Sequence, residues 1–111
     1  MIYTVEDLIN DILESYRREG KIVRTDYDSL VIRIYRRNGG RVSLRTVMEK
    51  LRKLARLNAV KTVRNRQCSY GVCTSDKTEV VIYIPVLQRM VLGRTITLTH
   101  YIQYGQRNTR G

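Results

Sequence analysis

The chain of 111 residues contains no tryptophan or phenylalanine, one proline and two cysteines. Its eight tyrosines must therefore supply all of the aromatic packing. It has no run of about 18 apolar residues, so we expect no transmembrane helix. The N-terminal residues lack the basic start and apolar stretch of a signal peptide, which predicts an intracellular protein. A chain of this length can form one domain with a modest core.

Acidic residues are also few. The chain has 10 Asp and Glu against 21 Lys and Arg, which gives a formal charge of +11 and a pI near 10.2. Residues 1–20 hold five acids and two bases, so the excess positive charge lies in the rest of the chain. A strongly basic domain with clustered cations is typical of nucleic-acid binders. The alternatives are an ordinary solvated surface or binding to acidic lipid or protein.

We find no arrangement of residues for catalysis or metal binding. The single histidine, His100, has no serine or cysteine partner in a recognisable pattern, and two cysteines alone cannot form a closed zinc site. Asp7, Asp11 and Glu14 share one flank of a predicted helix, as in some metal-dependent nucleases, but such carboxylates more often form a solvated face. We therefore expect no enzyme, no cofactor, no metal and no small-molecule ligand.

The N-terminal region predicts an amphipathic helix. Thr4 can cap a helix that runs to about Arg18, with Asp7 at its third position as in a capping box. Acidic residues lie in its first turn and basic residues in its last, as the helix dipole favours. Its predicted buried stripe is Leu8, Ile9, Ile12, Leu13 and Tyr16.

A short strand over residues 21–24 is predicted to follow. Thr25 or Asp26 can then cap a second helix over residues 27–37. Residues 29–35 are rich in β-branched and aromatic side chains, so a strand is the alternative for this segment.

A basic amphipathic helix is predicted after a glycine turn at residues 38–40. Ser43 caps it, it ends near Leu57, and Asn58 can adopt the left-handed conformation that ends a helix. Its apolar stripe comprises Leu44, Val47, Met48, Leu51, Leu54 and Ala55. The opposite face carries Arg45, Thr46, Glu49, Lys50, Arg52, Lys53 and Arg56. One face can pack on a core while the other meets an anionic partner.

Residues 60–66 and 77–84 are predicted to form the arms of a hairpin that Pro85 ends. Cys68 and Cys73 lie between the arms, at a spacing that suits a disulfide across the mouth of the hairpin. Most intracellular proteins keep such thiols reduced, with hyperthermophilic archaea as an exception, so both states stay open.

This order of elements resembles the winged helix-turn-helix family of DNA-binding proteins. The resemblance covers about residues 4–85. It is clearest in the segments that look like the family's recognition helix and its exit into the wing, namely Val42-Ser-Leu-Arg-Thr-Val47, Leu51-Arg-Lys-Leu54 and Leu57-Asn-Ala-Val60. Small regulators encoded by archaea and their viruses are nearest in size and charge. Tyr35 departs from the pattern, because the family usually has a small residue there, and Asn58 replaces the usual glycine.

The resemblance implies an α+β fold. A winged helix-turn-helix domain of three helices and a β-hairpin wing would span residues 1–85, with a C-terminal extension over residues 86–111. Within the extension, residues 86–92 suit a turn of helix, residues 95–102 alternate like a strand, and the polar end is expected to be frayed. The resemblance also implies a homodimer, because paired half-sites are common in the family. The apolar tail over residues 86–104 is the preferred contact, and the acidic first helix is the alternative. The expected location is the cytoplasm, or the host cytoplasm if the protein is viral.

In the family, the start of the third helix meets base edges in the major groove while other cations contact phosphates. The resemblance therefore implies a DNA-binding recognition helix with contacts from Ser43, Arg45, Thr46, Glu49, Lys50, Arg52, Lys53 and Arg56. Arg45 is the preferred candidate for a guanine contact. Glu49 can accept a hydrogen bond from a cytosine amine or instead pair with Lys53.

Two further groups of residues are implied. Arg36, Arg37 and Arg41 flank the turn, where they either contact the DNA backbone or form a solvated face. The wing would contribute Lys61, Arg64, Arg66, Gln67, Tyr70 and Lys77, with Tyr70 at its tip. A disulfide between Cys68 and Cys73 would stiffen that tip for binding, and a merely stapled surface loop is the alternative.

Together these observations predict a sequence-preferring protein that binds double-stranded DNA and regulates transcription. The alternatives are a non-specific RNA- or DNA-binding protein and a winged-helix module that contacts another protein.

Overall fold

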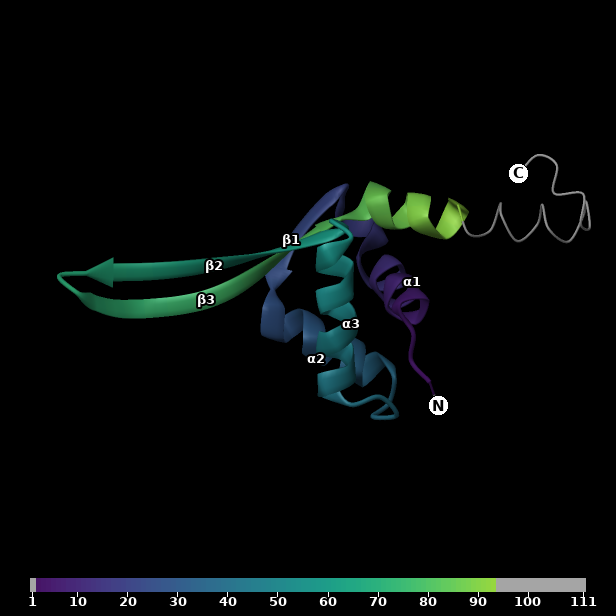
Figure 1. The fold of residues 1–111 in the computed structure, drawn as a ribbon, viewed down its shortest axis with the longest axis horizontal. Helices are drawn as coiled ribbons and strands as arrows, with labels where there is room; N and C mark the ends of the chain where they lie inside the picture. The colour runs from purple at the N-terminus through teal and green to yellow at the C-terminus, as the bar shows by residue number, and fades with distance from the viewer. Residues whose placement is uncertain (1, 94–111) are drawn as a thin grey trace, which may run out of the picture.

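The computed structural model describes residues 2–93, except for the side chains of residues 74–76. Its elements are α1 (Val5–Tyr16), the 3₁₀ turn η1 (Arg17–Glu19), β1 (Ile22–Asp26), α2 (Tyr27–Arg37), α3 (Leu44–Arg56), β2 (Val60–Ser69) and β3 (Val72–Tyr83). Residues 84–93 are helical as well. The helices gather at one end of a long hairpin made of β2 and β3 (Figure 1).

The helices α1, α2 and α3 each begin at a side chain that accepts a hydrogen bond from the first turn. Thr4 Oγ1 accepts from the Asp7 N–H at 3.2 Å, and Asp7 Oδ2 accepts from the Thr4 N–H at 2.9 Å, which completes a capping box. Asp26 caps α2 and Ser43 caps α3, each accepting from the N–H three residues on, at 3.2 and 3.1 Å. The predicted helix starts are confirmed, and Asp26 rather than Thr25 is the second cap.

The first helix ends earlier than the predicted Arg18. Its α-helical part stops at Tyr16, and Arg17–Glu19 tighten into η1 before Gly20 turns the chain with φ at 127°. A closing 3₁₀ turn satisfies terminal carbonyls that an α-helix leaves without partners. A side chain at residue 20 would strain this backbone, so glycine is the residue that fits there.

The strand alternative for residues 29–35 is wrong, because these residues lie in α2. The helix places Leu30, Val31 and Ile34 together in the core, whereas Ile32 is 41% exposed. A strand would have put residues 30, 32 and 34 on one face and Val31 on the other. The helical period therefore matches the burial, and β-propensity does not decide this segment.

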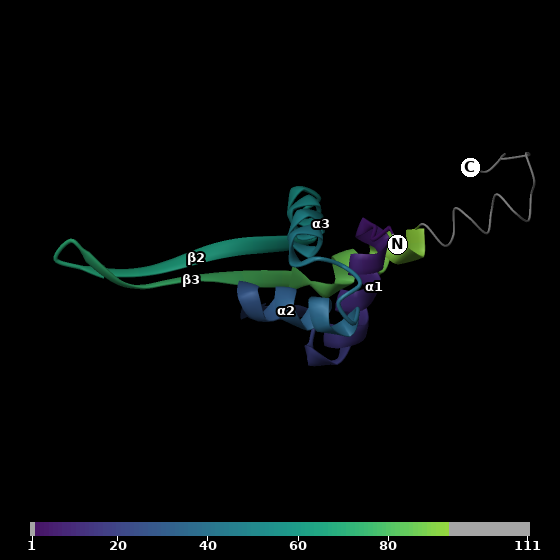
Figure 2. The same ribbon diagram turned by 90° about the horizontal axis from the view of Figure 1, so that it is seen from below.

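The described strands form one antiparallel sheet in the order β1-β3-β2. Its register aligns Val23, Ile82 and Val60 across the three strands. These residues are buried with Val80 under the helices, so the helices cover the face of the sheet that carries them. The outer half of the hairpin projects beyond the helices in both views (Figures 1 and 2).

The hairpin arms are longer toward the tip than the predicted 60–66 and 77–84. The strands continue to a two-residue turn at Tyr70 and Gly71, where both residues have positive φ, as in the turns that suit a tight hairpin. The outer arms have no alternating apolar residues in their sequence, so hydrophobic alternation could not reveal them. At the other end, Ile84 is helical rather than extended, and Pro85 fits because the first turn of a helix needs no N–H there.

A single core joins the helices to the sheet. Every residue of the predicted α1 stripe is buried, and α3 contributes Val47, Leu51 and Leu54. Leu44 was predicted to join the α3 stripe, but it is 42% exposed because it lies in the first turn at the edge of the core. Leu87 is fully buried in the same core, so the start of the predicted C-terminal extension belongs to the packed domain. The strand predicted for residues 95–102 lies outside the described residues.

The architecture is therefore a small α+β domain with helices on one face of an antiparallel sheet. Its element order is compatible with a winged helix-turn-helix domain.

Candidate nucleic-acid interface

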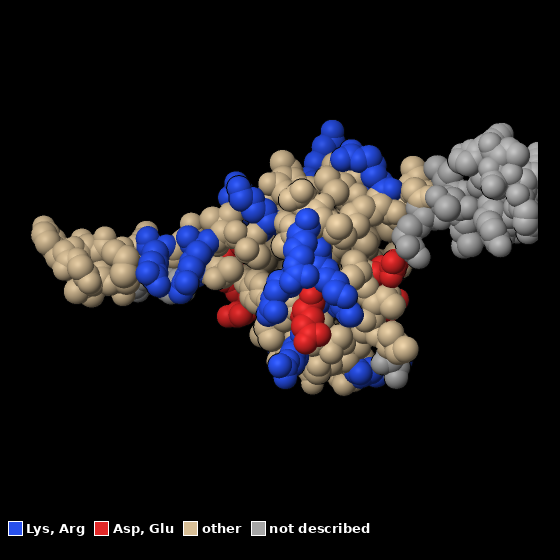
Figure 3. All heavy atoms as spheres, in the orientation of Figure 1, with Lys and Arg blue, Asp and Glu red and all other residues tan. Residues whose placement is uncertain are grey.

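The polar face of α3 lies at the surface. Ser43, Arg45, Glu49, Arg52, Lys53 and Arg56 are exposed, and Thr46 and Lys50 are half-buried. Figure 3 shows basic side chains over α3 and along the hairpin on the same face of the molecule. The apolar side of α3 is held in the core, so this basic face is presented by a rigid element.

The start of α3 is fixed on both sides of its cap. Val42, just before the Ser43 cap, is buried in the same core as Val47 in the next turn. This is the arrangement of a hydrophobic staple, which sets the angle at which the chain enters the helix. Arg45, two residues after the cap, has 87% of its side chain exposed. The apolar side of the first turn is thus packed on the core, while its polar side is exposed to solvent.

Glu49 pairs with a different residue from the one the sequence predicted. Its Oε1 lies 3.7 Å from Arg45 Nε, one turn earlier on α3, whereas the expectation was Lys53, one turn later. Both spacings are i,i+4, so sequence spacing alone does not distinguish them. The pair is well exposed, and such pairs contribute little to folding stability. Arg45 therefore remains available to a competing anionic partner.

The arginines around the turn behave differently from one another. Arg36 and Arg41 are exposed. Arg37 instead pairs with two carboxylates of α1: its Nε lies 3.2 Å from Asp11 Oδ1, and its Nη2 contacts Glu14. Its charge is already compensated within the protein, so a phosphate contact by Arg37 would compete with the link between α1 and α2.

A polar network around Asp11 ties α1 to the turn before α3. Tyr3 donates its hydroxyl hydrogen to Asp11 Oδ2 at 2.5 Å, and Asn38 Nδ2 donates to the same oxygen at 3.1 Å. Burial, reinforced by the hydrogen bond to Asp11, raises the pKa of Tyr3 well above its ordinary value. No partner for Tyr3 was predicted from the sequence, although its place just before the Thr4 cap is a signal for burial.

The carboxylates considered for a metal-dependent nuclease have protein partners. Asp7 completes the α1 cap, Asp11 accepts from Tyr3 and Asn38, and Glu14 contacts Arg37. Among the side chains that the structure describes within residues 2–93, no three of His, Cys, Asp or Glu lie close enough to hold a metal ion. In the same part of the chain, no helix has the length and apolar character needed to span a membrane.

The predicted wing residues are divided between the two faces of the hairpin. Side chains alternate along a strand, so Arg64 and Arg66 continue the helix-covered face of the sheet, whereas Lys61 and Gln67 lie on the other face. Lys77 is opposite Asn65 and therefore shares the face of Lys61 and Gln67. All five side chains are exposed, so each face of the hairpin presents lysine or arginine, while β3 also carries the acids Asp76 and Glu79.

Cys68 and Cys73 face each other across the hairpin, with their Cα atoms 3.9 Å apart and their sulfur atoms at the 2.09 Å of a disulfide bond. Beyond them lies the turn, where Tyr70 is fully exposed and Val72 is 61% exposed. The position predicted for Tyr70 at the tip is confirmed. Val72 was not among the predicted site residues, because it resembles an ordinary strand residue.

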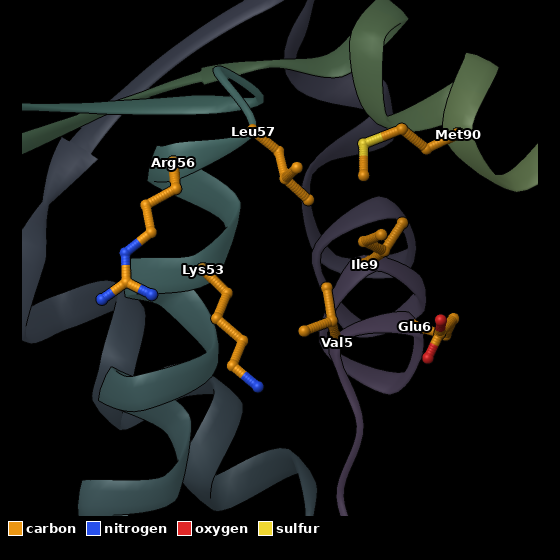
Figure 4. A pocket seen from close by; sticks show the side chains of 7 residues that line it. All are labelled: Val5, Glu6, Ile9, Lys53, Arg56, Leu57 and Met90. Carbon is orange, nitrogen blue, oxygen red and sulfur yellow. The ribbon is translucent and has the colours of Figure 1, made fainter.

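An apolar cleft of about 560 Å³ lies between α1, the end of α3 and the helix of residues 84–93. Its lining includes Val5, Ile9, Leu57 and Met90, with Lys53 directed toward it (Figure 4). Lys53 and Arg56 thus belong both to the polar face of α3 and to the edge of this apolar cleft. Sequence patterns did not reveal this cleft, because its lining comes from three separate segments.

No match to this chain was found among protein-family models, curated proteins or solved structures. The functional argument therefore depends on the residues and their geometry.

Proposed function

We propose that this protein binds double-stranded DNA in a sequence-preferring manner as a winged helix-turn-helix transcription regulator. The observation that carries the proposal is the basic face of α3, held at its capped start by the core and lying on the same face of the molecule as hairpin cations (Figure 3). An α-helix fits the major groove, and Arg and Lys supply the phosphate contacts that dominate affinity.

The two ends of α3 have different roles in this proposal. Ser43, Arg45 and Glu49 lie in its first turns and meet base edges, with Arg45 giving bidentate hydrogen bonds to guanine. Arg52, Lys53 and Arg56 lie further along and meet phosphates. The hairpin acts as the wing and follows the neighbouring backbone with Arg64, Arg66 and Lys77.

Homodimerisation is part of the proposal, because two half-sites double the length of DNA that is read. Leu57 and Leu92 are 55% and 57% exposed on the side of the domain that holds the apolar cleft and the helix of residues 84–93. Sedimentation equilibrium of the full chain, with and without DNA, tests the proposed homodimer. A monomer at every concentration under both conditions would contradict it.

The central test is selection from a random pool of duplex DNA, followed by binding measurements over a range of salt. We expect a defined motif and an affinity whose logarithm falls linearly with the logarithm of salt concentration, by about 0.9 per phosphate contacted. Binding without a motif, on RNA and DNA alike, favours the non-specific alternative. Absence of binding to any nucleic acid favours a protein-interaction module.

A further inference from the structure

The tip of the hairpin has an unusual composition for a solvent-exposed turn. Tyr70 is fully exposed and Val72 is 61% exposed. The turn between β2 and β3 lies at the end of the hairpin that points away from the helices (Figures 1 and 2). Exposed apolar residues that occur singly need no explanation, but here two lie within three residues of one another, one in the projecting turn and one at the start of β3. The turn has no core beneath it against which either residue can pack.

The backbone at this turn is also unfavourable for the residue it holds. Tyr70 has φ at 52°, a left-handed conformation that bulky side chains adopt rarely, and Gly71 follows at 81°. Asn and Gly are the usual residues of such a turn, because they accept positive φ at lower cost. A tyrosine at this position therefore destabilises the turn relative to the common choice. A strained residue at an exposed tip points to a role for the ring outside the folding of the domain.

Two further features support contact with DNA rather than with an apolar surface. Behind the tip, Arg64, Arg66 and Lys77 give the hairpin cations on both faces, which suits a groove lined by phosphates on both sides. The disulfide between Cys68 and Cys73 lies between those cations and the tip. This bond joins β2 to β3 next to the turn and limits the separation of the two strands there.

We propose that the hairpin tip is a wedge that inserts Tyr70 and Val72 into the minor groove and partly unstacks one base step, thereby bending the DNA. This inference rests on the proposed function and extends it to deformation of the duplex. Apolar wedges inserted at the minor groove bend DNA by about 20–90° toward the major groove. The pyrimidine–purine steps, which unstack most easily, are the expected sites of insertion.

The test uses the full chain and the duplex obtained by selection, with fluorescent dyes at its ends and 2-aminopurine at the expected step. We expect wild-type protein to bring the ends closer and to raise the 2-aminopurine emission, because the base loses stacking. Tyr70→Gly is the main variant, since glycine accepts the positive φ and preserves the turn while removing the ring. It should bind about 10-fold more weakly and leave the duplex nearly straight.

Tyr70→Phe is the matched control, because it keeps the ring and loses only the hydroxyl. It should bend the duplex like the wild type. Binding of the wild type without bending, or equal bending by Tyr70→Gly, overturns the wedge and leaves the proposed function intact. Failure of the wild type to bind any duplex overturns both. Association with anionic lipid vesicles that depends on Tyr70, together with unchanged DNA bending in Tyr70→Gly, also overturns the wedge and assigns the tip to a membrane surface.

Discussion

Arg45 and Glu49 lie one turn apart on the exposed face of α3, with Arg45 Nε 3.7 Å from Glu49 Oε1. An acid thus occupies the middle of the basic surface and partly neutralises the residue proposed to read guanine. Both side chains are exposed, so the pair is weak and can exchange for contacts with DNA.

Glu49→Gln should therefore raise the affinity for DNA several-fold at low salt, because it removes repulsion from phosphates and releases Arg45. If Glu49 accepts from a cytosine, the variant should also lose preference at that base pair. Binding isotherms on the selected duplex measure both effects. Glu19→Gln, on η1, makes the same change in net charge outside the proposed interface and should have a smaller effect. Equal gains from both variants would show that only net charge matters.

Arg45→Ala should change the sequence selectivity of binding, whereas Arg66→Ala should change the overall affinity. Loss of Arg45 should relax selectivity at one base pair by about 1–3 kcal/mol, whereas loss of Arg66 should weaken binding to all sequences alike and reduce the salt slope by about 1. Competition between the selected duplex and single-base variants separates the two patterns. Small and equal effects from both substitutions would contradict the assigned roles.

Tyr3→Phe should destabilise the fold by about 1.5 kcal/mol at neutral pH, because it removes a hydrogen bond to the Asp11 carboxylate. Urea denaturation followed by circular dichroism measures this loss. Asn38 and Arg37 still contact Asp11 in the variant, so the fold should survive. An unchanged midpoint would show that the network around Asp11 does not support the turn.

The same variant should change the pH dependence. Burial raises the pKa of Tyr3 above its ordinary value of 10.0, so above that pH the unfolded chain loses the Tyr3 proton while the folded protein retains it. The contribution of Tyr3 to the free energy of unfolding should therefore be fully present below pH 10 and should be lost as the pH rises further. Tyr3→Phe should make this fall shallower in unfolding experiments from pH 8 to 11. A curve parallel to the wild type would contradict this origin of the pH dependence.

Asn58 ends α3 with φ at 61°, a conformation that alanine adopts only with strain. Asn58→Ala should cost about 1–2 kcal/mol of stability, whereas Asn58→Gly should be close to neutral. Thermal unfolding of the two variants measures the difference. Similar losses in both would show that the Asn58 side chain, and not its backbone conformation, stabilises the exit into β2.

Replacing both Cys68 and Cys73 by serine should affect binding more than folding. The disulfide lies in the projecting half of the hairpin, away from the core, so the melting temperature of the helical part should change little. The affinity for DNA should fall several-fold, because a looser tip loses more conformational entropy on binding. Equal affinity of the oxidised wild type and the double variant would favour a merely stapled surface loop.

Local sequence placed the starts of α1, α2 and α3 to within a residue, because the determinants of a helix start are local. The Thr4, Asp26 and Ser43 caps act within three residues, and the buried stripes follow the 3.6-residue period. Asn58 was identifiable as the end of α3 for the same reason. The basic composition can be read directly from the sequence. The polar face of α3 was also predictable, because it depends only on the helical period of one segment.

The remaining features depend on how separate segments meet. Arg37 was expected either to contact the DNA backbone or to lie on a solvated face, yet the packing of α2 against α1 places it beside Asp11 and Glu14. The Tyr3 network and the cleft between three helices arise in the same way. Such contacts depend on tertiary packing, because side chains distant in the sequence interact only after the core has set the positions of the helices.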